Sequence, residues 1–254
     1  MDSTTEDLRF IAPHDPYQAL YIHIPFCVSR CKYCDFHTQA IASNDRRIES
    51  YIEDLSLAIR LAGRNGELGD IKTVYIGGGT PSHVGLSRLS MLLYTLSLSM
   101  HLTEDVECSM EANPESLTER MVRDLWALGV NRLSIGVQSF DDNVLAILGR
   151  AHDAEAARVA ISAAQTRFDN VSIDLIAGIP GTDGSAFVWS VQEAIALGVP
   201  HISVYPLTIE DGTPLSKLVE AGHMTEPDED EQADAMLEAQ RLLHRAGYKR
   251  YEVA

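Results

Sequence analysis

The chain has few basic residues for its size and no long apolar run. Of its 254 residues, 20 are Lys or Arg and 37 are Asp or Glu, which gives a formal net charge of −17. A nucleic-acid partner is not expected, because phosphate binding needs clustered Lys and Arg. No apolar run reaches the about 20 residues of a membrane span, and the acidic start "MDSTTEDLRF" lacks the pattern of a signal peptide. We therefore expect a cytoplasmic protein.

Cysteine is also scarce, and two common nucleotide-binding motifs are missing. The four cysteines are expected to be reduced thiols, because a reducing compartment does not sustain a disulfide framework. The glycine-rich stretch "GGGTPS" (77–82) lacks the Gly-Lys-Ser/Thr of a Walker loop. Ser82 stands where a Rossmann fingerprint needs its last glycine. The stretch therefore predicts either a plain glycine turn or a close approach of the backbone to a ligand.

Short β-branched runs alternate with amphipathic helical patterns along the whole chain. The apolar runs predict strands at 19–24, 72–77, 105–112, 131–137, 170–176 and 201–207. Apolar residues at three- and four-residue spacing predict helices at 47–63, 85–100, 118–129, 154–165, 186–198 and 229–247. Such strand–helix alternation predicts an α/β fold with a parallel sheet, either open and doubly wound or a partial barrel.

An internal echo favours the barrel. The stretches "LGVNRLSIGV" and "LGVPHISVYP" each follow a predicted helix, and their first glycines, at 129 and 198, lie 69 positions apart. That interval equals two strand–helix units of about 35 residues, which is close to the period of a βα barrel. The sequence therefore predicts a partial (βα)6 barrel with parallel strands.

The two ends of the chain differ from this regular pattern. We expect residues 1–18 to form an acidic N-terminal extension and residues 19–254 to form the barrel core. The final "YKRYEVA" (248–254) predicts the start of a seventh strand. We therefore expect the chain to be a fragment whose C-terminal domain is truncated.

Three of the four cysteines fall within eight positions, in "HIPFCVSRCKYCDFHTQ" (23–39). Cys27, Cys31 and Cys34 form a C-x3-C-x2-C pattern just after the first predicted strand, where parallel barrels keep their sites. One interpretation is a structural zinc site with His37, or less naturally His23, as the fourth ligand. A second is three buried, inert thiols, which the polar and basic neighbours disfavour.

The third interpretation is an iron–sulfur cube. A 4Fe–4S cluster normally takes four thiolates, so a site with three cysteines leaves one iron open for chemistry. The fourth cysteine, Cys108, lies within the apolar run "VECSM" and is expected to fill the core.

Polar residues follow several of the predicted strands at their carboxyl ends. Glu111 closes the third strand in "MEANP", and Gln138 closes the fourth in "IGVQSF". Asp174 lies inside the apolar fifth strand, where a carboxylate is costly unless it is paired or hydrogen-bonded. We expect Arg150 of "LGRAHD" to supply its counter-charge. Each residue alone is as consistent with a cap or an internal salt bridge, but together they predict a ligand site.

The cysteine pattern, with the aromatic Tyr33 just before its last cysteine, resembles the signature of radical S-adenosylmethionine (SAM) enzymes. The resemblance implies a partial (βα)6 barrel and a 4Fe–4S cluster held by the three cysteines. It also implies that SAM occupies the open iron, and that an electron from the cluster cleaves SAM to a 5′-deoxyadenosyl radical.

Further stretches resemble one branch of that group. These are "YIHIPFC", "CKYCDF", "GGGTPS", "EANPE", "GVNRLSIGVQSFDD", "LGRAHD", "SIDLIAGIPG" and "YPLTIEDGTPL". From about residue 19 onward the chain is similar to the HemW-type heme chaperones, which are relatives of the oxygen-independent coproporphyrinogen III dehydrogenases (HemN). The resemblance implies that Tyr21, Tyr33, Gly78 and Glu111 contact the cluster-bound SAM. Gly79, Thr80, Gln138, Arg150 and Asp174 match positions that hold a second SAM in the dehydrogenase.

Two departures from the dehydrogenase pattern bear on function. Phe36 stands where the dehydrogenase carries a further cysteine, which favours the chaperone branch. The family's C-terminal His-Asn-x-x-Tyr-Trp stretch, linked to heme binding, is not part of this sequence. The resemblance implies a protein that binds heme or a porphyrin, takes an electron from a donor and passes heme to an acceptor protein. Any membrane contact would be indirect, through such acceptors; radical decarboxylation of coproporphyrinogen and a zinc-stapled barrel are the alternatives.

Overall fold

A computed structural model describes residues 15–253, and the proposed extension lies mostly outside them, in residues 1–14. The main sheet has six parallel strands in the order β1-β4-β5-β6-β7-β8. Their bounds are β1 Tyr17–Ile24, β4 Leu68–Gly78, β5 His101–Ala112, β6 Arg132–Gln138, β7 Asn170–Ala177 and β8 His201–Pro206. All six predicted strands are confirmed, and β1 begins two residues earlier than expected.

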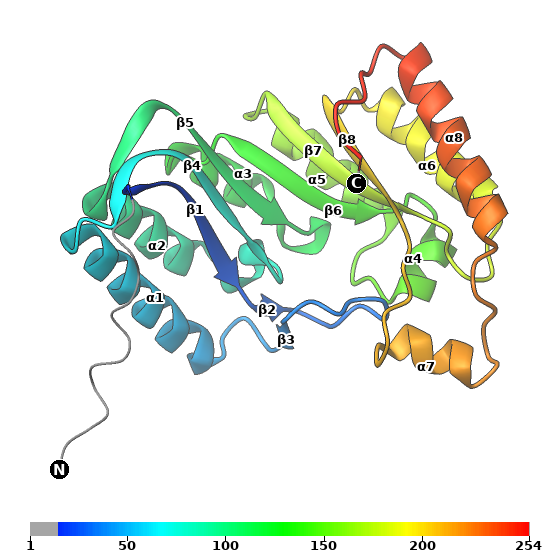
Figure 1. Ribbon diagram of the computed structural model, residues 1–254, viewed down its shortest axis with the longest axis horizontal. Helices are drawn as coiled ribbons and strands as arrows, with labels where there is room; N and C mark the ends of the chain where they lie inside the picture. Colours follow the sequence, from blue (N-terminus) through cyan, green and yellow to red (C-terminus); the bar gives the residue numbers. More distant parts are fainter. Residues whose placement is uncertain (1–14, 254) are drawn as a thin grey trace.

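Helices connect successive strands of the sheet, as the sequence pattern predicts. The six predicted helices are α1 Arg46–Arg64, α2 Leu86–Ser99, α3 Glu119–Ala127, α5 Ala154–Gln165, α6 Gly184–Ala196 and α8 Glu229–Arg245. Side chains cap several of their first turns, with Asp45 before α1 and Asp153 before α5 accepting backbone N–H bonds. Figure 1 shows these helices along the sheet, with α8 beside α6 and β8.

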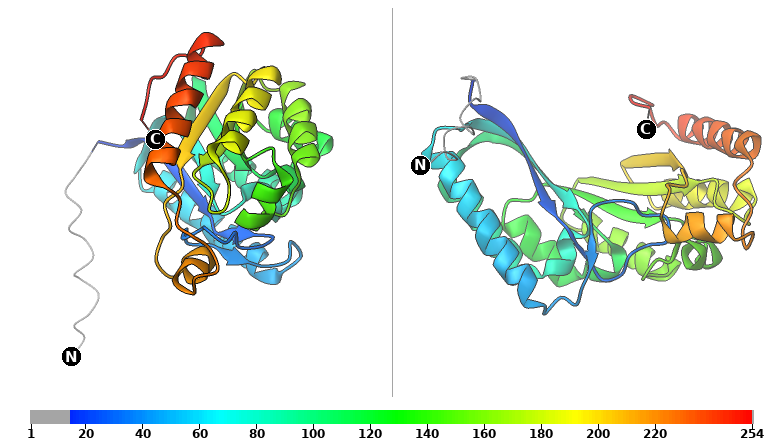
Figure 2. Two further views of the ribbon diagram at one scale, coloured as in Figure 1. Left: turned by 90° about the vertical axis from the view of Figure 1, so that its right-hand side faces the viewer. Right: turned by 60° about the horizontal axis from the view of Figure 1, so that its bottom comes forward.

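The sheet is curved and open, which makes the fold a partial (βα)6 barrel. Its order places β1 and β8 at the two edges of the six strands that the structure describes. Figure 2 shows the curvature of the sheet from two further directions. Parallel register brings the carboxyl ends of the strands to one rim, where His23 pairs with Gly77, and Ala177 with Pro206.

The sequence did not predict several short elements, and most of them lie near that rim. They are β2 Phe26–Cys27, β3 Gln39–Ala40, η1 Pro81–Val84, η2 Pro114–Ser116, α4 Asp142–Leu148 and α7 Pro214–Glu220. The strands β2 and β3 form a separate two-stranded parallel sheet. Figure 1 shows it directly beyond the end of β1.

The prediction of a seventh strand at 248–254 is wrong for the residues that the structure describes. Residues 248–253 form no strand there. Instead, the Tyr248 hydroxyl donates to the Val199 carbonyl, and the Tyr251 hydroxyl lies 3.2 Å from His201 Nε2. These side-chain contacts attach the segment beside the start of β8. Among residues 15–253, none of the helices combines the length and apolar composition that a membrane span requires.

Candidate functional site

The two faces of the sheet have opposite chemistry, and this difference creates the site. On β7, Val171, Ile173 and Leu175 are fully buried, and they belong to the main apolar core. Alternate residues of the same strands, including Asp174, face an open cavity of about 2040 Å³. Most of the strand residues that line the cavity are polar, among them Tyr75, Glu111, Arg132, Ser134, Gln138, Asp174, Ser203 and Tyr205, whereas Ile176, Ile202 and Val204 are apolar. Strands of parallel sheets are usually apolar on both faces, so this alternation marks a hollow, ligand-accessible interior.

The cysteine loop is anchored at the rim of the cavity through Lys32. The Lys32 amide donates to the Leu148 carbonyl at 2.9 Å, and the Leu215 amide donates to the Lys32 carbonyl at 2.8 Å. The ammonium group of Lys32 also donates to the Ala146 carbonyl at 3.1 Å. These contacts come from α4 and α7, the two helices that the sequence did not predict. Both helices therefore serve to hold the segment between Cys31 and Cys34 in place.

Cys27, Cys31 and Cys34 are free, half-buried thiols, whereas Cys108 is buried in the core as predicted. Two hydrogen-bond donors point at the loop sulfurs. The Thr80 hydroxyl lies 3.5 Å from Cys27 Sγ, and Arg150 Nη1 lies 3.4 Å from Cys31 Sγ. Burial raises the pKa values of Cys27 and Cys34, and the neighbouring thiolates add to the effect.

The zinc interpretation finds no support in this geometry. Within residues 15–253, no three His, Cys, Asp or Glu side chains converge as ligands of one metal ion. A single zinc ion needs such convergence, because all four ligands bind one centre at about 2.0–2.3 Å. Both His23 nitrogens are already engaged, Nδ1 with the Tyr21 hydroxyl at 3.0 Å and Nε2 with the His37 carbonyl at 3.1 Å. A cube makes a different demand, since each thiolate binds a different iron.

The glycines after β4 bring backbone close to the cysteine loop. A Cβ on Gly79 would lie 3.0 Å from Cys27 Sγ and 2.8 Å from the Phe26 amide nitrogen. Gly78 has φ +115°, a conformation that side chains disfavour, and a Cβ there would lie 2.7 Å from the His23 ring. These glycines therefore let the backbone approach the cysteine loop and His23 closely, and the approach of "GGGTP" to a ligand stays a prediction.

Glu111 is held rigidly at the end of β5. The Tyr75 hydroxyl donates to Glu111 Oε1 at 2.8 Å, and the Gly78 amide donates to Oε2 at 3.0 Å. Burial raises the pKa of Glu111, although these two hydrogen bonds partly offset the effect. The half-buried carboxylate faces the cavity, where it can accept from a cationic or N–H group of a ligand. Exposed Tyr21, on β1, stacks its ring on Tyr75 with centroids 6.1 Å apart.

Arg150 reaches the cysteine loop instead of Asp174. Its Nη2 donates to Asn113 Oδ1 at 2.8 Å and to the Gly136 carbonyl at 2.7 Å. Tyr33 lies against the same guanidinium group, and burial raises the pKa of the Tyr33 hydroxyl. Our expectation that Arg150 supplies the counter-charge of Asp174 is therefore wrong. The guanidinium extends to the other side of the rim, where Asn113 and Gly136 hold it.

Arg132, at the start of β6, is the cation whose positive charge acts on Asp174, while its guanidinium donates to Ser109 Oγ at 3.2 Å. Burial raises the pKa of Asp174 to about 6, and the negative charge of Glu111 adds to this effect. Hydrogen bonds from Ser203 and Ser134 and the positive charge of Arg132 act in the opposite direction. Arg132 on β6 and Asp174 on the neighbouring strand β7 share the cavity face, which sequence spacing alone did not reveal.

Gln138 has a strained backbone at the rim. Its φ of +69° is the only positive value among the non-glycine residues that the structure describes. Such a conformation costs about 1–3 kcal/mol and is concentrated at functional sites. The side chain is buried and lines the cavity, so this residue fits its predicted place in the site.

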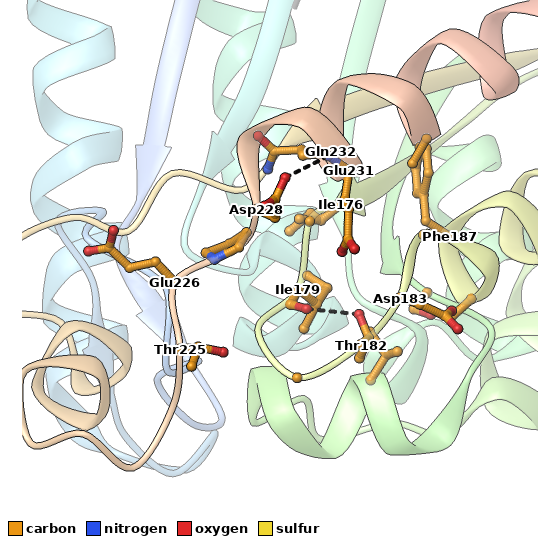
Figure 3. Close-up of a pocket in the computed structure, with 18 residues that line it drawn as sticks. Ile176, Ile179, Thr182, Asp183, Phe187, Thr225, Glu226, Asp228, Glu231 and Gln232 are labelled. Atoms are coloured by element: carbon orange, nitrogen blue, oxygen red, sulfur yellow. Dashed lines mark hydrogen bonds between the residues drawn. The ribbon is translucent and has the colours of Figure 1, made fainter.

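A second, smaller pocket of about 210 Å³ lies where α8 meets the loop after β7 (Figure 3). Gln232 donates to the carbonyls of Ala177 and Leu207 at 3.3 Å each, which ties α8 to the ends of β7 and β8. A Cβ on Gly178 would collide with the Gln232 amide at 2.1 Å. The pocket thus lies at the contact between α8 and the loop after β7, and its four carboxylates, Asp183, Glu226, Asp228 and Glu231, are exposed.

The sequence reasoning missed three residues of the site: Tyr75, Arg132 and Asn113. Tyr75 holds Glu111, Arg132 faces Asp174, and Asn113 connects Thr80 to Arg150. A signal for all three was available, since each occupies a cavity-facing position or follows Glu111 by two residues in "MEANP". Period-two counting along each strand would have found Tyr75 and Arg132.

Comparison with known proteins identifies the class of this site. The sequence profile of the Radical SAM superfamily matches residues 21–194, and the chain belongs to this superfamily. The superfamily implies a 4Fe–4S cluster and SAM. The donor set fits both groups, because Cys34 lines the cavity with Glu111, and the free thiols of Cys27 and Cys31 belong to the same loop.

More specific likenesses point to one branch. The chain is 39% identical to a heme chaperone HemW of Mycobacterium tuberculosis over 248 residues, which are 95% of this chain and 62% of that protein. It is 37% identical to the heme chaperone HemW of Escherichia coli over 244 residues, 94% of this chain and 62% of that protein. The chain thus spans less than two thirds of these curated relatives.

A solved structure also supports membership of the radical SAM superfamily. The chain matches the coproporphyrinogen III oxidase HemN of Escherichia coli, a radical SAM enzyme, with a TM-score of 0.84 and 25% sequence identity. The match covers 93% of this chain and 54% of that one. The partial (βα)6 barrel is therefore a shared fold, and the HemN-like character of the core is confirmed.

Proposed function

We propose that this chain is the radical SAM core of a HemW-type heme chaperone, which binds heme and transfers it to acceptor proteins. The observation that carries the proposal is a loop of three free thiols in which Cys34 lines the cavity, Thr80 lies beside Cys27 and Arg150 lies beside Cys31. The 39% and 37% identity to HemW chaperones supports the same function. Cytoplasmic location is part of the proposal, and it agrees with the acidic composition.

Cys27, Cys31 and Cys34 would each hold one iron of a 4Fe–4S cluster, and SAM would take the fourth. The cluster supplies single electrons to SAM when both are bound, and an external electron donor must reload it. Tyr21, Tyr33, Gly78 and Glu111 would contact this SAM. The rigid Glu111 carboxylate suits its ammonium group, because both carboxylate oxygens are already aligned by Tyr75 and Gly78.

The remaining predicted residues would bind a further ligand deeper in the cavity. Gly79, Thr80, Gln138, Arg150 and Asp174 match the second-SAM positions of the dehydrogenase. Of these, Gln138 and Asp174 line the cavity, while Thr80 and Arg150 connect its rim to the thiols. A porphyrin is a flat apolar ring with carboxylate side chains, and Arg132 is a cavity-facing cation that could pair with one carboxylate.

The test is anaerobic reconstitution of the chain with iron and sulfide. About four irons per chain, as one 4Fe–4S cube requires, together with 5′-deoxyadenosine after addition of SAM and reductant, would support the proposed site. Heme titration followed by transfer to an apo-acceptor would then test the chaperone function. Zinc without iron, with His37→Ala releasing the metal, would favour the zinc-stapled barrel instead.

Coproporphyrinogen decarboxylation is the second candidate, favoured by the structural match to HemN. Phe36 argues against it, because the dehydrogenase has a cysteine at that position. Phe36 is exposed and lines the cavity next to Cys34, so it changes the chemistry of the site directly. A reconstituted chain that releases carbon dioxide from coproporphyrinogen would select the decarboxylase; heme transfer without release would select the chaperone.

A further inference from the structure

Asn113 is the centre of a hydrogen-bond network that reaches two of the three cysteine sulfurs. Its side-chain Nδ2 donates to Thr80 Oγ1 at 3.1 Å, and Thr80 Oγ1 in turn lies 3.5 Å from Cys27 Sγ. On its other side, Asn113 Oδ1 accepts from Arg150 Nη2 at 2.8 Å. Arg150 Nη1 then lies 3.4 Å from Cys31 Sγ. One amide group therefore orients both donors.

The orientation of this amide is fixed from several directions. Nδ2 also donates to Glu115 Oε1 at 3.2 Å, and the backbone N–H of Asn113 donates to Ser82 Oγ at 3.3 Å. Glu115 Oε2 lies 3.4 Å from Nδ1 of His152, whose side chain is fully buried. A flip of the side-chain amide would lose its bonds to Thr80, Glu115 and Arg150.

Gly136 on β6 makes room for the Asn113–Arg150 pair. A Cβ at this position would lie 2.9 Å from Asn113 Oδ1 and 3.4 Å from Arg150 Nη2. The Gly136 carbonyl accepts from the same Nη2 at 2.7 Å. The close approach therefore lets the guanidinium bind the amide and the backbone together, with its other nitrogen free to reach Cys31.

The direction of the Thr80 hydroxyl follows from the chemistry of its partners. A hydroxyl has one hydrogen to donate and two lone pairs that accept. Because Asn113 Nδ2 donates to Thr80 Oγ1, the hydrogen of Thr80 is left for Cys27 Sγ. An acceptor in place of Nδ2 would draw that hydrogen away from the sulfur.

We propose that Asn113 is a positioning residue that sets the reduction potential of the cluster by aiming Thr80 at Cys27 and Arg150 at Cys31. Hydrogen bonds to ligand sulfurs are one of the factors that tune iron–sulfur potentials. Donors stabilise the more negative, reduced cluster, so they raise its potential. The same network connects the cluster to Thr80 and Arg150, two positions proposed for a further ligand. This inference rests on the proposed assignment of the cluster to the three cysteines.

The decisive variants are Asn113→Asp and Asn113→Ala. Aspartate has the shape of asparagine and keeps the bond to Arg150, but it accepts the Thr80 hydrogen and adds a negative charge. We expect Asn113→Asp to lower the midpoint potential by about 59 mV, which is a tenfold change in a one-electron equilibrium. Asn113→Ala leaves Thr80 free to donate to Cys27, so its shift should be smaller. If Asn113 served only packing, Asn113→Ala should shift the midpoint potential more than Asn113→Asp, because alanine removes more contacts.

Two further variants separate the effect of added charge from the effect of hydrogen-bond orientation. Thr80→Val removes the donor to Cys27 without changing charge, and it should lower the potential in the same direction. Asn131→Asp is the matched control, since Asn131 also makes two structural bonds, to the Cys108 amide and the Val106 carbonyl. Neither bond reaches a thiol of the loop, so the midpoint potential of the cluster in Asn131→Asp should equal that of the wild type.

The measurement is a redox titration of the reconstituted full chain without SAM. Electron paramagnetic resonance monitors the reduced cluster at each potential. Iron analysis and absorption spectra of the wild type come first. A wild type without a 4Fe–4S cluster overturns the proposed site, and this inference with it. A wild-type cluster with equal potentials in Asn113→Asp, Thr80→Val and Asn131→Asp overturns the positioning role alone. A selective decrease in the first two supports it.

Discussion

The two faces of the central sheet are made from the same strands but obey different physical rules. Ile173 and Leu175 on β7 are fully buried against the helices, whereas Asp174 between them faces the cavity. On the helix face, apolar contact stabilises the fold, and any side chain of suitable size and polarity serves. On the cavity face, polar groups are placed by partners: Tyr75 orients Glu111, and Ser134, Ser203 and Arg132 surround Asp174.

This difference shows that the helix face contributes stability and the cavity face contributes the candidate ligand site. The helix face carries the free energy of folding, because it removes apolar surface from water. The cavity face raises the cost of folding, because burial raises the pKa values of both Glu111 and Asp174 and thus disfavours their charged forms. Substitutions on the two faces should therefore have separable effects, and paired variants can test that separation.

The two classes of cysteine give the largest expected contrast. Cys27→Ala should reduce the iron content of the reconstituted chain from about four per chain, the content of one cube, to near zero. Cys108→Ala, on the helix face, should leave iron content unchanged, because its thiol is buried away from the loop. Iron and sulfide analysis after reconstitution measures both. Retention of a full cluster in Cys27→Ala would refute the proposed ligand set.

A core substitution on the helix face should act on stability instead. Ile173→Ala should lower the free energy of unfolding by about 2–5 kcal/mol, because it leaves a cavity at a fully buried site. Urea denaturation measures the loss. Val159→Ala on α5 is the control, since Val159 is 57% exposed and its change should stay within about 0.5 kcal/mol. Folded Ile173→Ala should still bind a cluster; loss of the cluster would mean that the faces are coupled.

On the cavity face, Glu111→Gln should weaken SAM binding while the protein remains folded. We expect the dissociation constant to rise at least about tenfold, or 1.4 kcal/mol, because a charge-assisted hydrogen bond to the ammonium group is lost. Isothermal titration of the reconstituted chain measures it. Glu107→Gln is the matched control, on the same face of the same strand and bonded to Ser109 at 2.9 Å. Equal affinities in the two variants would exclude Glu111 as a SAM contact.

A further expected effect is the pH dependence of stability from Asp174. Its folded pKa of about 6 lies above its usual value, so the folded state holds the proton more tightly than the unfolded chain. The free energy of unfolding should therefore fall as pH rises from about 4 to 6. Asp174→Asn should remove that fall, as urea denaturation across this range would show.

Asp183 provides a control of opposite sign for that experiment. Hydrogen bonds from Ser185 lower the pKa of Asp183, which caps α6. Its contribution to stability is present at neutral pH and is lost as pH falls through the lowered pKa. Asp183→Asn should thus flatten the acid side of the profile. A wild-type profile that rises between pH 4 and 6 and is unchanged by Asp174→Asn would contradict the assigned burial effect.

Much of this architecture could be predicted from residue patterns. Each of the six strands and six of the helices follows from periodicity, since a parallel sheet needs apolar residues on its helix face. The cysteine spacing, Glu111 and Gln138 near strand ends, and Asp174 inside an apolar strand were also recognisable. The short helices α4 and α7 were not, because each has seven residues and little periodic signal. Yet both clamp Lys32 in the cysteine loop.

The sequence by itself determined where the six strands lie along the chain, which residues form the apolar core and where the three thiols cluster. These features depend on local periodicity and spacing. Only the tertiary structure decided which polar groups meet. It placed Arg150 against Asn113 and Cys31, and it left Arg132 as the cation facing Asp174. Such pairings depend on where strands from distant parts of the chain stand beside one another, and that register is set by packing of the whole sheet.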